Sequence, residues 1–308
     1  MISCCLVVLN FNGQSHLKDC LDSAFLAVRA FADNCPVVVV DNHSTEDDVQ
    51  YLRSNYPQVE IIIAKKNGYL FSLNEAVALR KEEIVFLLNN DVRFDPDFMA
   101  PLLGHFEDAK VFAVSCKTMD WEGTRVITAK RYGYFKKMWF YRKWDTNVSQ
   151  AVLTLDFCGG ASAVRRTTFL ELGGFDRLFY PGYFEDTDLS YRAWKQGWKI
   201  IYEPRSVIYH KISASFNKEY GHERAARLIC RNEILFTLKN CGNLFFAISY
   251  LFLLPFRALR SLFSGNLTQA FGIFNSLPKI PLALIKRFGG ARTNVCKEST
   301  FLPEIAGQ

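Results

Sequence analysis

Four apolar segments of the sequence each run into polar side chains that could hold a ligand. Any one of these motifs could simply form a turn or cap a helix, because Asn and Asp favour both. In an open α/β sheet, ligands bind beyond the carboxyl ends of the strands, so motifs that follow successive strands meet at one edge. We therefore predict a binding site built from Asn10-Phe11-Asn12, Asp41-Asn42, Lys66-Asn67-Gly68 and Asn89-Asn90-Asp91.

Asp91 has the clearest chemical requirement of these residues. It follows the apolar residues 85–88, and a buried strand tolerates a terminal carboxylate only when something compensates its charge. A divalent cation such as Mg²⁺ would do so, with carboxylate oxygen and substrate phosphates as its ligands. The alternative is that Asp91 caps the next turn. Asp41 is a candidate for accepting a hydrogen bond from a base N–H or a ribose hydroxyl of a nucleotide.

A second acidic cluster, Glu185-Asp186-Thr187-Asp188, lies at the expected start of a helix. Acids in a first helical turn are stabilised by the helix dipole by roughly 0.3–1 kcal/mol each, which is the simplest reason for their presence. Three acids exceed that need. Crowded carboxylates raise the pKa of at least one of them, and a carboxylate near a hydroxyl group can take its proton. Asp188 is predicted to fix the helix start or its loop.

The elements that must position these residues alternate in a manner typical of a parallel, doubly wound α/β sheet. The expected strands are residues 4–9, 37–40, 60–63, 84–88 and 111–115. Ser15 is a candidate N-cap for the first helix, and Asp95-Pro96 reads as the start of another that turns Phe98, Leu102 and Phe106 inward. The helix that begins near Glu185 should end before Gly197.

Composition and charge divide the chain into two regions. Of its 308 residues, 49% are hydrophobic and 27 are Phe, and the net charge is +6. From Ala226 onward ten Lys or Arg stand against three Glu, so the tail carries +7 and residues 1–225 carry −1. Nine scattered cysteines without a CxxC pair indicate reduced thiols, and the apolar start lacks the basic region of a signal peptide, so a cytoplasmic location is expected.

The predicted organisation is a catalytic α/β domain over residues 1–225 and a helical region over residues 226–308. A basic, aromatic flap is expected at about residues 120–150, because residues 130–144 hold six basic and seven aromatic side chains. In the tail, Pro255 and Pro278 interrupt apolar runs, so neither run reads as a clean membrane span. Apolar and basic side chains there favour peripheral attachment to an anionic membrane surface, and the alternative is helix packing in a core or an oligomer.

Taken together, the motifs resemble family-2 glycosyltransferases of the GT-A fold over residues 2–232. The landmarks are VVLNFNG, VVVVDNHST, NGYLFSLNEAV, FLLNNDV, GGASAVRR and GYFEDTDLSYRAWKQGW followed by YH. Bacterial rhamnosyltransferase-like enzymes of cell-envelope glycans are the nearest type. The resemblance implies a nucleotide-sugar donor, a Mn²⁺ or Mg²⁺ ion on Asp91 and His210, and inversion at the sugar carbon.

The same resemblance assigns the remaining residues. Asp186 is the expected base, with Glu185 binding the acceptor or sharing that role. Asn12 and Asp41 are placed at the nucleotide, and Asn74 near the sugar-diphosphate. The full set assigned to the donor is Asn10, Asn12, Asp41, Asn42, Asn67, Asn74, Asn90 and Gly160. Some family members have an acid-x-acid motif at this strand end, and Asn89 stands where the first of its two carboxylates would be. This weakens the expectation of metal use.

Other functions fit the sequence less well. A sugar-1-phosphate nucleotidylyltransferase normally needs a basic, Gly-rich loop, and residues 10–14 contain no Lys or Arg. A catalytically silent nucleotide-sugar scaffold would explain Asn89 but would need no base. No nucleic-acid partner is expected, because no recognised module accompanies the basic flap. UDP- and dTDP-sugars remain open as donors, and the basic, apolar tail favours a glycan or lipid-linked glycan acceptor at the inner face of the cytoplasmic membrane.

Overall fold

The central element is a mixed sheet of ten strands. In this computed structural model, residues 2–31, 34–211, 221–289 and 296–307 are described. The strands of the sheet are β1 (Cys4–Asn10), β2 (Val37–Asp41), β3 (Glu60–Ile63), β4 (Ile84–Asn89), β5 (Val92–Phe94), β6 (Val111–Asp120), β7 (Val126–Thr128), β10 (Val152–Leu153), β11 (Ala161–Arg165) and β12 (Lys199–His210). Their order is β10-β12-β6-β11-β4-β1-β2-β3, with β5 added to β12 and β7 added to β6.

The strand directions correct one expectation. The predicted strands all form and begin at the expected residues, and β1, β2, β3 and β4 run parallel to one another. However, β11 is inserted antiparallel between β4 and β6, and β5 and β10 pair antiparallel with β12. The apolar pattern could not show this, because a strand that is buried on both faces reads alike in either direction.

Six helices flank the sheet or connect its strands. They are α1 (Gln14–Phe31), α2 (Asp48–Asn55), α3 (Leu73–Leu79), α4 (Met99–Gly104), α5 (Arg166–Glu171) and α6 (Glu185–Lys195), with 3₁₀ turns at Tyr69–Ser72, His105–Glu107 and Arg177–Phe179. The buried side chains of α1 recur at helical spacing and are Leu17, Cys20, Leu21, Ala24, Ala27 and Val28. Gly197 follows α6 with φ of 82°, the left-handed conformation predicted for a residue that ends a helix.

Two predicted helix starts are wrong. Helix α1 begins at Gln14, so Ser15 lies inside it and is not its N-cap. Helix α4 begins only at Met99, because Asp95 accepts a hydrogen bond from the Asp97 N–H at 3.1 Å and forms a turn of its own first. Phe98, Leu102 and Phe106 are nevertheless buried, as the sequence predicted.

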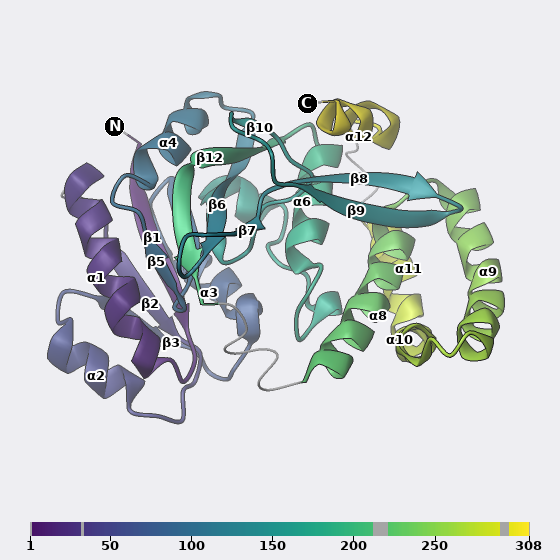
Figure 1. Ribbon diagram of the computed structural model, residues 1–308, viewed down its shortest axis with the longest axis horizontal. Coiled ribbons are helices and arrows are strands. Elements are labelled where there is room, and N and C mark those ends of the chain that lie inside the picture. Colours follow the sequence, from purple (N-terminus) through teal and green to yellow (C-terminus); the bar gives the residue numbers. More distant parts are fainter. Residues whose placement is uncertain (1, 32–33, 212–220, 290–295, 308) are drawn as a thin grey trace.

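A β-hairpin and a set of helices extend from the sheet on the side of α6. The hairpin, β8 (Lys130–Lys136) and β9 (Trp139–Asp145), forms the predicted flap. The helices are α8 (His222–Asn240), α9 (Leu244–Phe263), α10 (Leu267–Ser276), α11 (Ile280–Gly289) and α12 (Glu298–Ala306), with a 3₁₀ turn at Leu277–Lys279. In Figure 1 the hairpin reaches from the sheet toward α9, which is the outermost element on the right, and α8 lies between α9 and the sheet.

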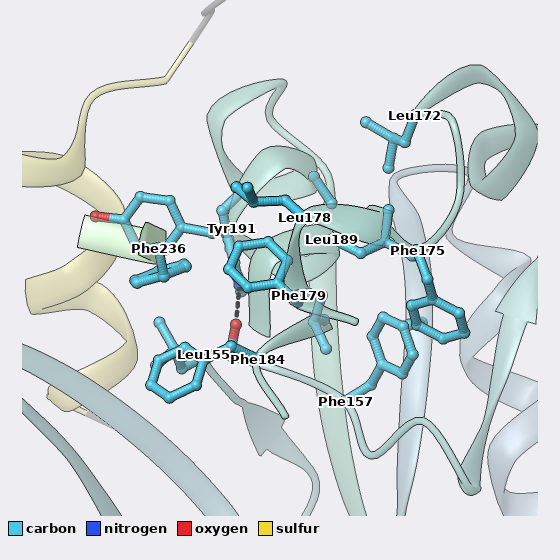
Figure 2. Packing of buried hydrophobic residues seen from close by; sticks show 14 of the residues in the cluster. Leu155, Phe157, Leu172, Phe175, Leu178, Phe179, Phe184, Leu189, Tyr191 and Phe236 are labelled. Carbon is cyan, nitrogen blue, oxygen red and sulfur yellow. Dashed lines mark hydrogen bonds between the residues drawn. The ribbon is translucent and has the colours of Figure 1, made fainter. Parts of the chain in front are cut away.

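One hydrophobic cluster joins the sheet to these helices. It contains Val85 of β4, Phe236 of α8, Tyr250 of α9 and Phe301 of α12. Figure 2 shows Phe236 beside aromatic side chains that come from the segment before α6. Helix α8 begins before the predicted domain boundary at residue 225 and continues past it. The helical region therefore packs as part of the body that carries the site.

Candidate active site

Asn10, at the end of β1, is the centre of a buried hydrogen-bond network. Its amide nitrogen donates to Asp48 Oδ2 at 2.7 Å and to Asp41 Oδ1 at 3.3 Å, and its amide oxygen accepts from Asn90 Nδ2 at 2.6 Å. Asp48 Oδ2 also accepts from the Gly13 N–H at 2.9 Å. Asn10 and Asn90 are buried and bonded to each other, so both support the strand ends in this structure. Their direct contact with the donor stays a prediction.

Asn42, at the end of β2, fixes the segment that follows β3. Its Oδ1 accepts from the Gly68 N–H at 2.9 Å and from Ser72 Oγ at 2.6 Å, and its Nδ2 donates to Asn67 Oδ1 at 2.9 Å. Asn67 Oδ1 also accepts from the Tyr69 N–H at 3.0 Å. Asn42 is buried and Asn67 half-buried, so of this pair Asn67 has the more accessible side chain.

Asn74 in α3 also acts on the backbone. Its Nδ2 donates to the Phe175 carbonyl oxygen and its Oδ1 accepts from the Phe175 N–H, both at 2.9 Å. This pair of bonds ties α3 to the segment that leads into α6. Asn74 thus holds that segment in the structure. The sequence analysis predicted a direct contact of Asn74 with the sugar-diphosphate and did not include this supporting role.

Asn12 and Asp41 lie where the loops after β1 and β2 meet. Asn12 Oδ1 accepts from the Thr45 N–H at 2.8 Å, and Asp41 Oδ1 accepts from Ser44 Oγ at 2.6 Å. Asn12 and His43 have φ values of 45° and 64°. Positive φ is unfavourable for residues other than glycine and persists where the surrounding structure imposes it, which is common at ligand sites. The side chains predicted for the nucleotide are therefore in two interlocked loops.

Asp91 and His210 are brought together by the strands that follow and precede them. His210 pairs with Val92 in the ladder between β12 and β5, and the Lys211 N–H donates to the Asp91 carbonyl oxygen at 2.9 Å. His210 Nε2 lies 3.1 Å from Asp91 Oδ1, and that buried oxygen receives no hydrogen bond in the described part of the chain.

This arrangement fits a metal site of few protein ligands. A carboxylate oxygen without a donor and an imidazole nitrogen beside it are both lone-pair groups suited to a divalent cation. Among the described residues, no group of three or more His, Cys, Asp or Glu side chains could hold a metal ion. Asp91 and His210 would therefore need oxygen atoms from a substrate phosphate to complete the coordination of Mn²⁺ or Mg²⁺.

Gly159 and Gly160 lie in space near the end of β4 and the start of α6. A Cβ atom placed on Gly160 would lie 2.4 Å from Asn89 Cγ, and one placed on Gly159 would lie 3.8 Å from Asp186 Cβ. Gly160 must therefore be glycine for Asn89 to keep its place. The Gly160 carbonyl oxygen also accepts from the Asn89 N–H at 3.0 Å, so this short segment lies next to the end of β4 and near the start of α6.

Glu185 and Asp186 begin α6 with pKa values above the ordinary range. Burial, followed by the charge of Asp186, raises the pKa of Glu185 to about 8. Burial and then the charge of Asp156 raise the pKa of Asp186, and two arginines oppose this shift. Asp186 Oδ1 accepts from the Thr187 N–H at 2.7 Å, whereas Glu185 Oε2 is buried without a partner among the described residues. One acid is thus held as a neutral carboxyl group near neutral pH.

The two arginines come from the flap. Arg131 donates to Asp156 Oδ2 at 2.8 Å, and Arg142 donates to Thr187 Oγ1 at 2.6 Å. Thr187 Oγ1 in turn donates to Asp156 Oδ2 at 2.6 Å. Their positive charges favour the ionised form of Asp186 and therefore lower its pKa against the effect of burial. The hairpin β8–β9 thus supplies the positive charges that lower the pKa of Asp186 in the acidic cluster.

The segment before α6 is held in a strained conformation by α8. Tyr183 and Phe184 have φ values of 68° and 73°. The buried Asn232 of α8 donates through Nδ2 to the carbonyl oxygens of Phe179, Gly182 and Tyr183 at 3.0, 2.7 and 2.8 Å. Asn232 therefore fixes the backbone that presents Glu185, so α8 is part of the site's support.

Asp188 fixes the start of α6, as the sequence predicted. Its Oδ1 accepts from Lys239 Nζ at 2.6 Å and from Asn240 Nδ2 at 2.7 Å, and its Oδ2 accepts from Arg192 Nε at 2.9 Å. Lys239 Nζ also contacts Asp176 Oδ2 at 2.7 Å. These buried ion pairs attach the start of α6 to α8.

We expect Glu185→Gln to stabilise the protein in a pH-dependent way. A carboxyl group whose pKa is about 8 when folded and 4.5 otherwise binds more protons in the folded state between these values, so wild-type stability falls as pH rises through that window. The variant's advantage in the free energy of unfolding should grow from about pH 4.5 to about pH 8 and then level off, reaching on the order of 1–4 kcal/mol.

Thermal unfolding at pH 5.5 and pH 9 measures this effect. The control is Glu171→Gln, which changes an exposed glutamate of α5 in the same way. An advantage of Glu185→Gln that is equal at both pH values would show that burial does not raise the pKa of Glu185.

Sequence reasoning missed several of these residues. Asp156 precedes Phe157-Cys158-Gly159-Gly160 and could have been recognised as another acid near a strand end. Asp48 was hidden in an acidic run, and Arg131 and Arg142 were indistinguishable from the other cations of the flap. Asn232 stands between the charged residues Arg231 and Glu233 in α8 and gave no spacing signal.

The sheet with its strand-end acid, its paired acids on α6 and the loops between them define a glycosyltransferase of the GT-A fold. The model of the family described as glycosyltransferase like family 2 matches residues 4–227. The chain therefore belongs to glycosyltransferase family 2, as the sequence motifs predicted, and it is an enzyme of that class.

Two curated relatives illustrate the family. The N-acetylglucosaminyl-diphospho-decaprenol L-rhamnosyltransferase of Mycobacterium tuberculosis is 26% identical over 251 residues, which are 72% of this chain and 80% of that protein. A putative polypeptide N-acetylgalactosaminyltransferase 10 of Drosophila melanogaster is 20% identical over 191 residues, 56% of this chain and 30% of that protein.

Solved structures support the fold. Mannosyltransferase PcManGT from Pyrobaculum calidifontis, in complex with GDP-Man and Mn²⁺, has a TM-score of 0.56 at 17% identity and covers 99% of this chain and 79% of its own. GalNAc-T7 with UDP, GalNAc and Mn²⁺ has a TM-score of 0.59 at 16% identity. That match covers 78% of this chain but 48% of GalNAc-T7, so this chain spans about half of that protein.

Proposed function

We propose that the enzyme transfers a sugar from a UDP- or dTDP-sugar to a hydroxyl group of a glycan or lipid-linked glycan, with inversion at the sugar carbon. The observation that carries the proposal is the position of Gly159-Gly160. The Gly160 carbonyl oxygen accepts from the N–H of Asn89, two residues before Asp91, at 3.0 Å, and a Cβ atom on Gly159 would lie 3.8 Å from Asp186 Cβ. This position supports a site in which a group that binds the donor diphosphate and a group that takes a proton act on one substrate pair.

In the proposed reaction, Asp186 accepts the proton of the acceptor hydroxyl as its oxygen forms a bond to the sugar C1. The bond between C1 and the phosphate oxygen breaks, and the nucleoside diphosphate leaves with the electron pair. Glu185, which is protonated near neutral pH, donates a hydrogen bond that orients the acceptor. Mn²⁺ or Mg²⁺ held by Asp91 and His210 would supply positive charge to the leaving diphosphate. Attack from the face opposite the leaving group inverts the configuration.

The choice of substrate class follows the mycobacterial relative, whose name specifies rhamnose transfer to an N-acetylglucosaminyl-diphospho-decaprenol. Incubation of the pure protein with UDP-hexoses, UDP-N-acetylhexosamines and dTDP-rhamnose in Mn²⁺, followed by measurement of released nucleotide, tests the donor. We expect release with one donor of this panel. Absence of both release and binding for every donor would favour a silent nucleotide-sugar scaffold instead.

We also propose that the enzyme is cytoplasmic and attaches to the inner face of the membrane through α9, α10 and α11. Residues 244–289 contain five basic and no acidic side chains. Helix α9 is long and apolar enough to cross a membrane, but its face with Tyr250 and Leu254 packs inside the protein. An in-plane arrangement is therefore favoured. Within residues 244–289, the exposed large apolar side chains are Leu244, Phe245, Ile248, Phe252, Phe256, Leu259, Leu262, Phe263, Leu267, Phe271, Phe274, Leu277, Leu282, Ile285 and Phe288.

Replacing three exposed phenylalanines of α9 should abolish this attachment. Because each buried Phe contributes about 1.5–3 kcal/mol, the variant Phe245→Ser, Phe252→Ser, Phe263→Ser should bind vesicles more than tenfold more weakly. Flotation with vesicles of about 30% anionic lipid at low salt measures binding. Leu79→Ser, which alters an exposed apolar residue of α3, is the control. A wild-type protein that remains soluble in this assay would contradict the proposal.

A further inference from the structure

A cleft of about 630 Å³ lies at the start of α8. Its lining includes Pro181, Glu223, Arg224, Arg227, Arg231 and Asn275, which come from the segment before α6 and from α8 and α10. Three of these side chains are arginines and one is a carboxylate. Arg227 forms an ion pair with that carboxylate, Glu223. The lining therefore keeps an excess of positive charge, and the amino-terminal end of a long helix adds to it.

Arg231 and a lysine outside the lining, Lys279, converge on one backbone atom. Arg231 donates to the Tyr180 carbonyl oxygen at 2.7 Å and to Asn232 Oδ1 at 2.9 Å. Lys279 Nζ lies 3.4 Å from the same Tyr180 oxygen and donates to the Leu178 carbonyl oxygen at 2.9 Å, so both cations have neutral acceptors but no anion among the described residues. Neither forms an ion pair with a carboxylate in the described part of the chain, and the nearby Asp176 is paired with Lys239 and Lys286. Burial lowers the pKa of Arg231 to about 10, while burial and then repulsion by Arg231 lower the pKa of Lys279 to about 8.

Two partly buried cations beside each other are unfavourable without an anion. Here Arg231 of α8 and Lys279 of the 3₁₀ turn after α10 lie next to each other. A bound anion with at least two negative charges would relieve both the burial and the repulsion. Phosphate groups match this requirement, because guanidinium and ammonium groups are their usual partners in proteins.

The surroundings of the cleft indicate what carries the phosphate. Arg227 lies over the ring of Phe271 at 4.4 Å, and Phe271, Phe274 and Leu277 are exposed on the apolar surface that we assign to the membrane. Pro181 in the lining belongs to the segment that leads into α6 and precedes Glu185 by four residues in the sequence. The cleft thus borders the apolar surface and includes one residue of the segment that leads to the acids of α6.

We propose that this cleft binds the diphosphate of a lipid-linked acceptor through Arg227, Arg231 and Lys279. The lipid chain would lie over Phe271 and Phe274, and the sugar would extend toward Glu185 and Asp186. This inference rests on the proposed function, because it assigns a place to the acceptor of that reaction.

Equilibrium binding of farnesyl diphosphate in the presence of a chelator tests the proposal without donor, metal or turnover. We expect wild-type protein to bind farnesyl diphosphate at least tenfold more tightly than farnesol or inorganic pyrophosphate. The double variant Arg227→Gln, Lys279→Gln should lose at least tenfold in affinity. Lys279→Arg keeps the charge and should stay within about threefold of wild type. Arg29→Gln removes an exposed charge of α1, outside the surface assigned to the membrane, and is the matched control.

Three outcomes would overturn the proposal. They are equal binding of farnesyl diphosphate by the wild type and the double variant, equal binding of farnesol and farnesyl diphosphate, and equal binding of pyrophosphate and farnesyl diphosphate. The double variant should still bind UDP in Mn²⁺ as the wild type does, since loss of UDP binding would assign these cations to the donor. Failure of sugar transfer alone would contradict the proposed function but would not change these affinities.

Discussion

Asp186→Asn is expected to lower the rate of sugar transfer by about 10²–10⁴-fold, the usual contribution of a positioned general base. The amide has the same shape as the carboxylate but cannot accept the hydroxyl proton. Its oxygen can still accept from the Thr187 N–H, a bond that measures 2.7 Å in the wild type. The fold and the affinity for the donor should therefore be unchanged, and the loss should fall on kcat.

Steady-state transfer with saturating donor measures this effect. Asp145→Asn, a change of the same kind at the end of β9, is the matched control and should retain wild-type kcat. Because Arg131 and Arg142 lower the pKa of Asp186 against burial, the acidic limb of the wild-type pH profile should report ionisation of this carboxyl, and that limb should disappear in Asp186→Asn. Full activity in Asp186→Asn would remove Asp186 from the reaction.

Asp91→Ala is expected to lower transfer by about 10²–10³-fold, comparable to the loss of one electrostatic contact in other active sites. It removes the carboxylate that would hold the cation at the donor diphosphate and leaves His210 as the remaining proposed ligand among the described residues. Unlike the change at Asp186, it should also abolish the gain in UDP affinity that Mn²⁺ gives to the wild type.

Titration of UDP with Mn²⁺ and with a chelator separates the two effects. Asp97→Ala removes an exposed carboxylate a few residues away and should preserve the metal-dependent gain. If Asp91→Ala still binds UDP more tightly in Mn²⁺, the cation binds elsewhere. That result would be expected if Asn89, in place of a carboxylate, prevents cation binding at this strand end.

The parts of the account that could be predicted from sequence are those that depend on local pattern. Runs of buried apolar residues predicted the first residue of β1 and of β4, and the spacing of Glu185 and Gly197 predicted α6. Strand direction was not predictable, because the insertion of β11 between β4 and β6 depends on pairing between distant segments. Helix starts were also misplaced where a polar residue could cap either a turn or a helix.

The candidate site divides in the same way. Motifs identified Asp91 and His210, and the structure places their side chains 3.1 Å apart. The same motifs could not show that the amides of Asn10 and Asn74 bind other protein groups here, and the contact of these residues with the donor stays a prediction. Support from α8 through Asn232 had no local signal, because it depends on packing between segments about 50 residues apart.

The most direct test of the account is the configuration of the sugar released at early times. With the active donor, Mn²⁺ and water as the acceptor, proton NMR of the hydrolysis product can be recorded before mutarotation. The account predicts that the first product has the anomeric configuration opposite to that of the donor and that Asp186→Asn suppresses its formation. A first product with the donor's own configuration would contradict direct displacement assisted by Asp186.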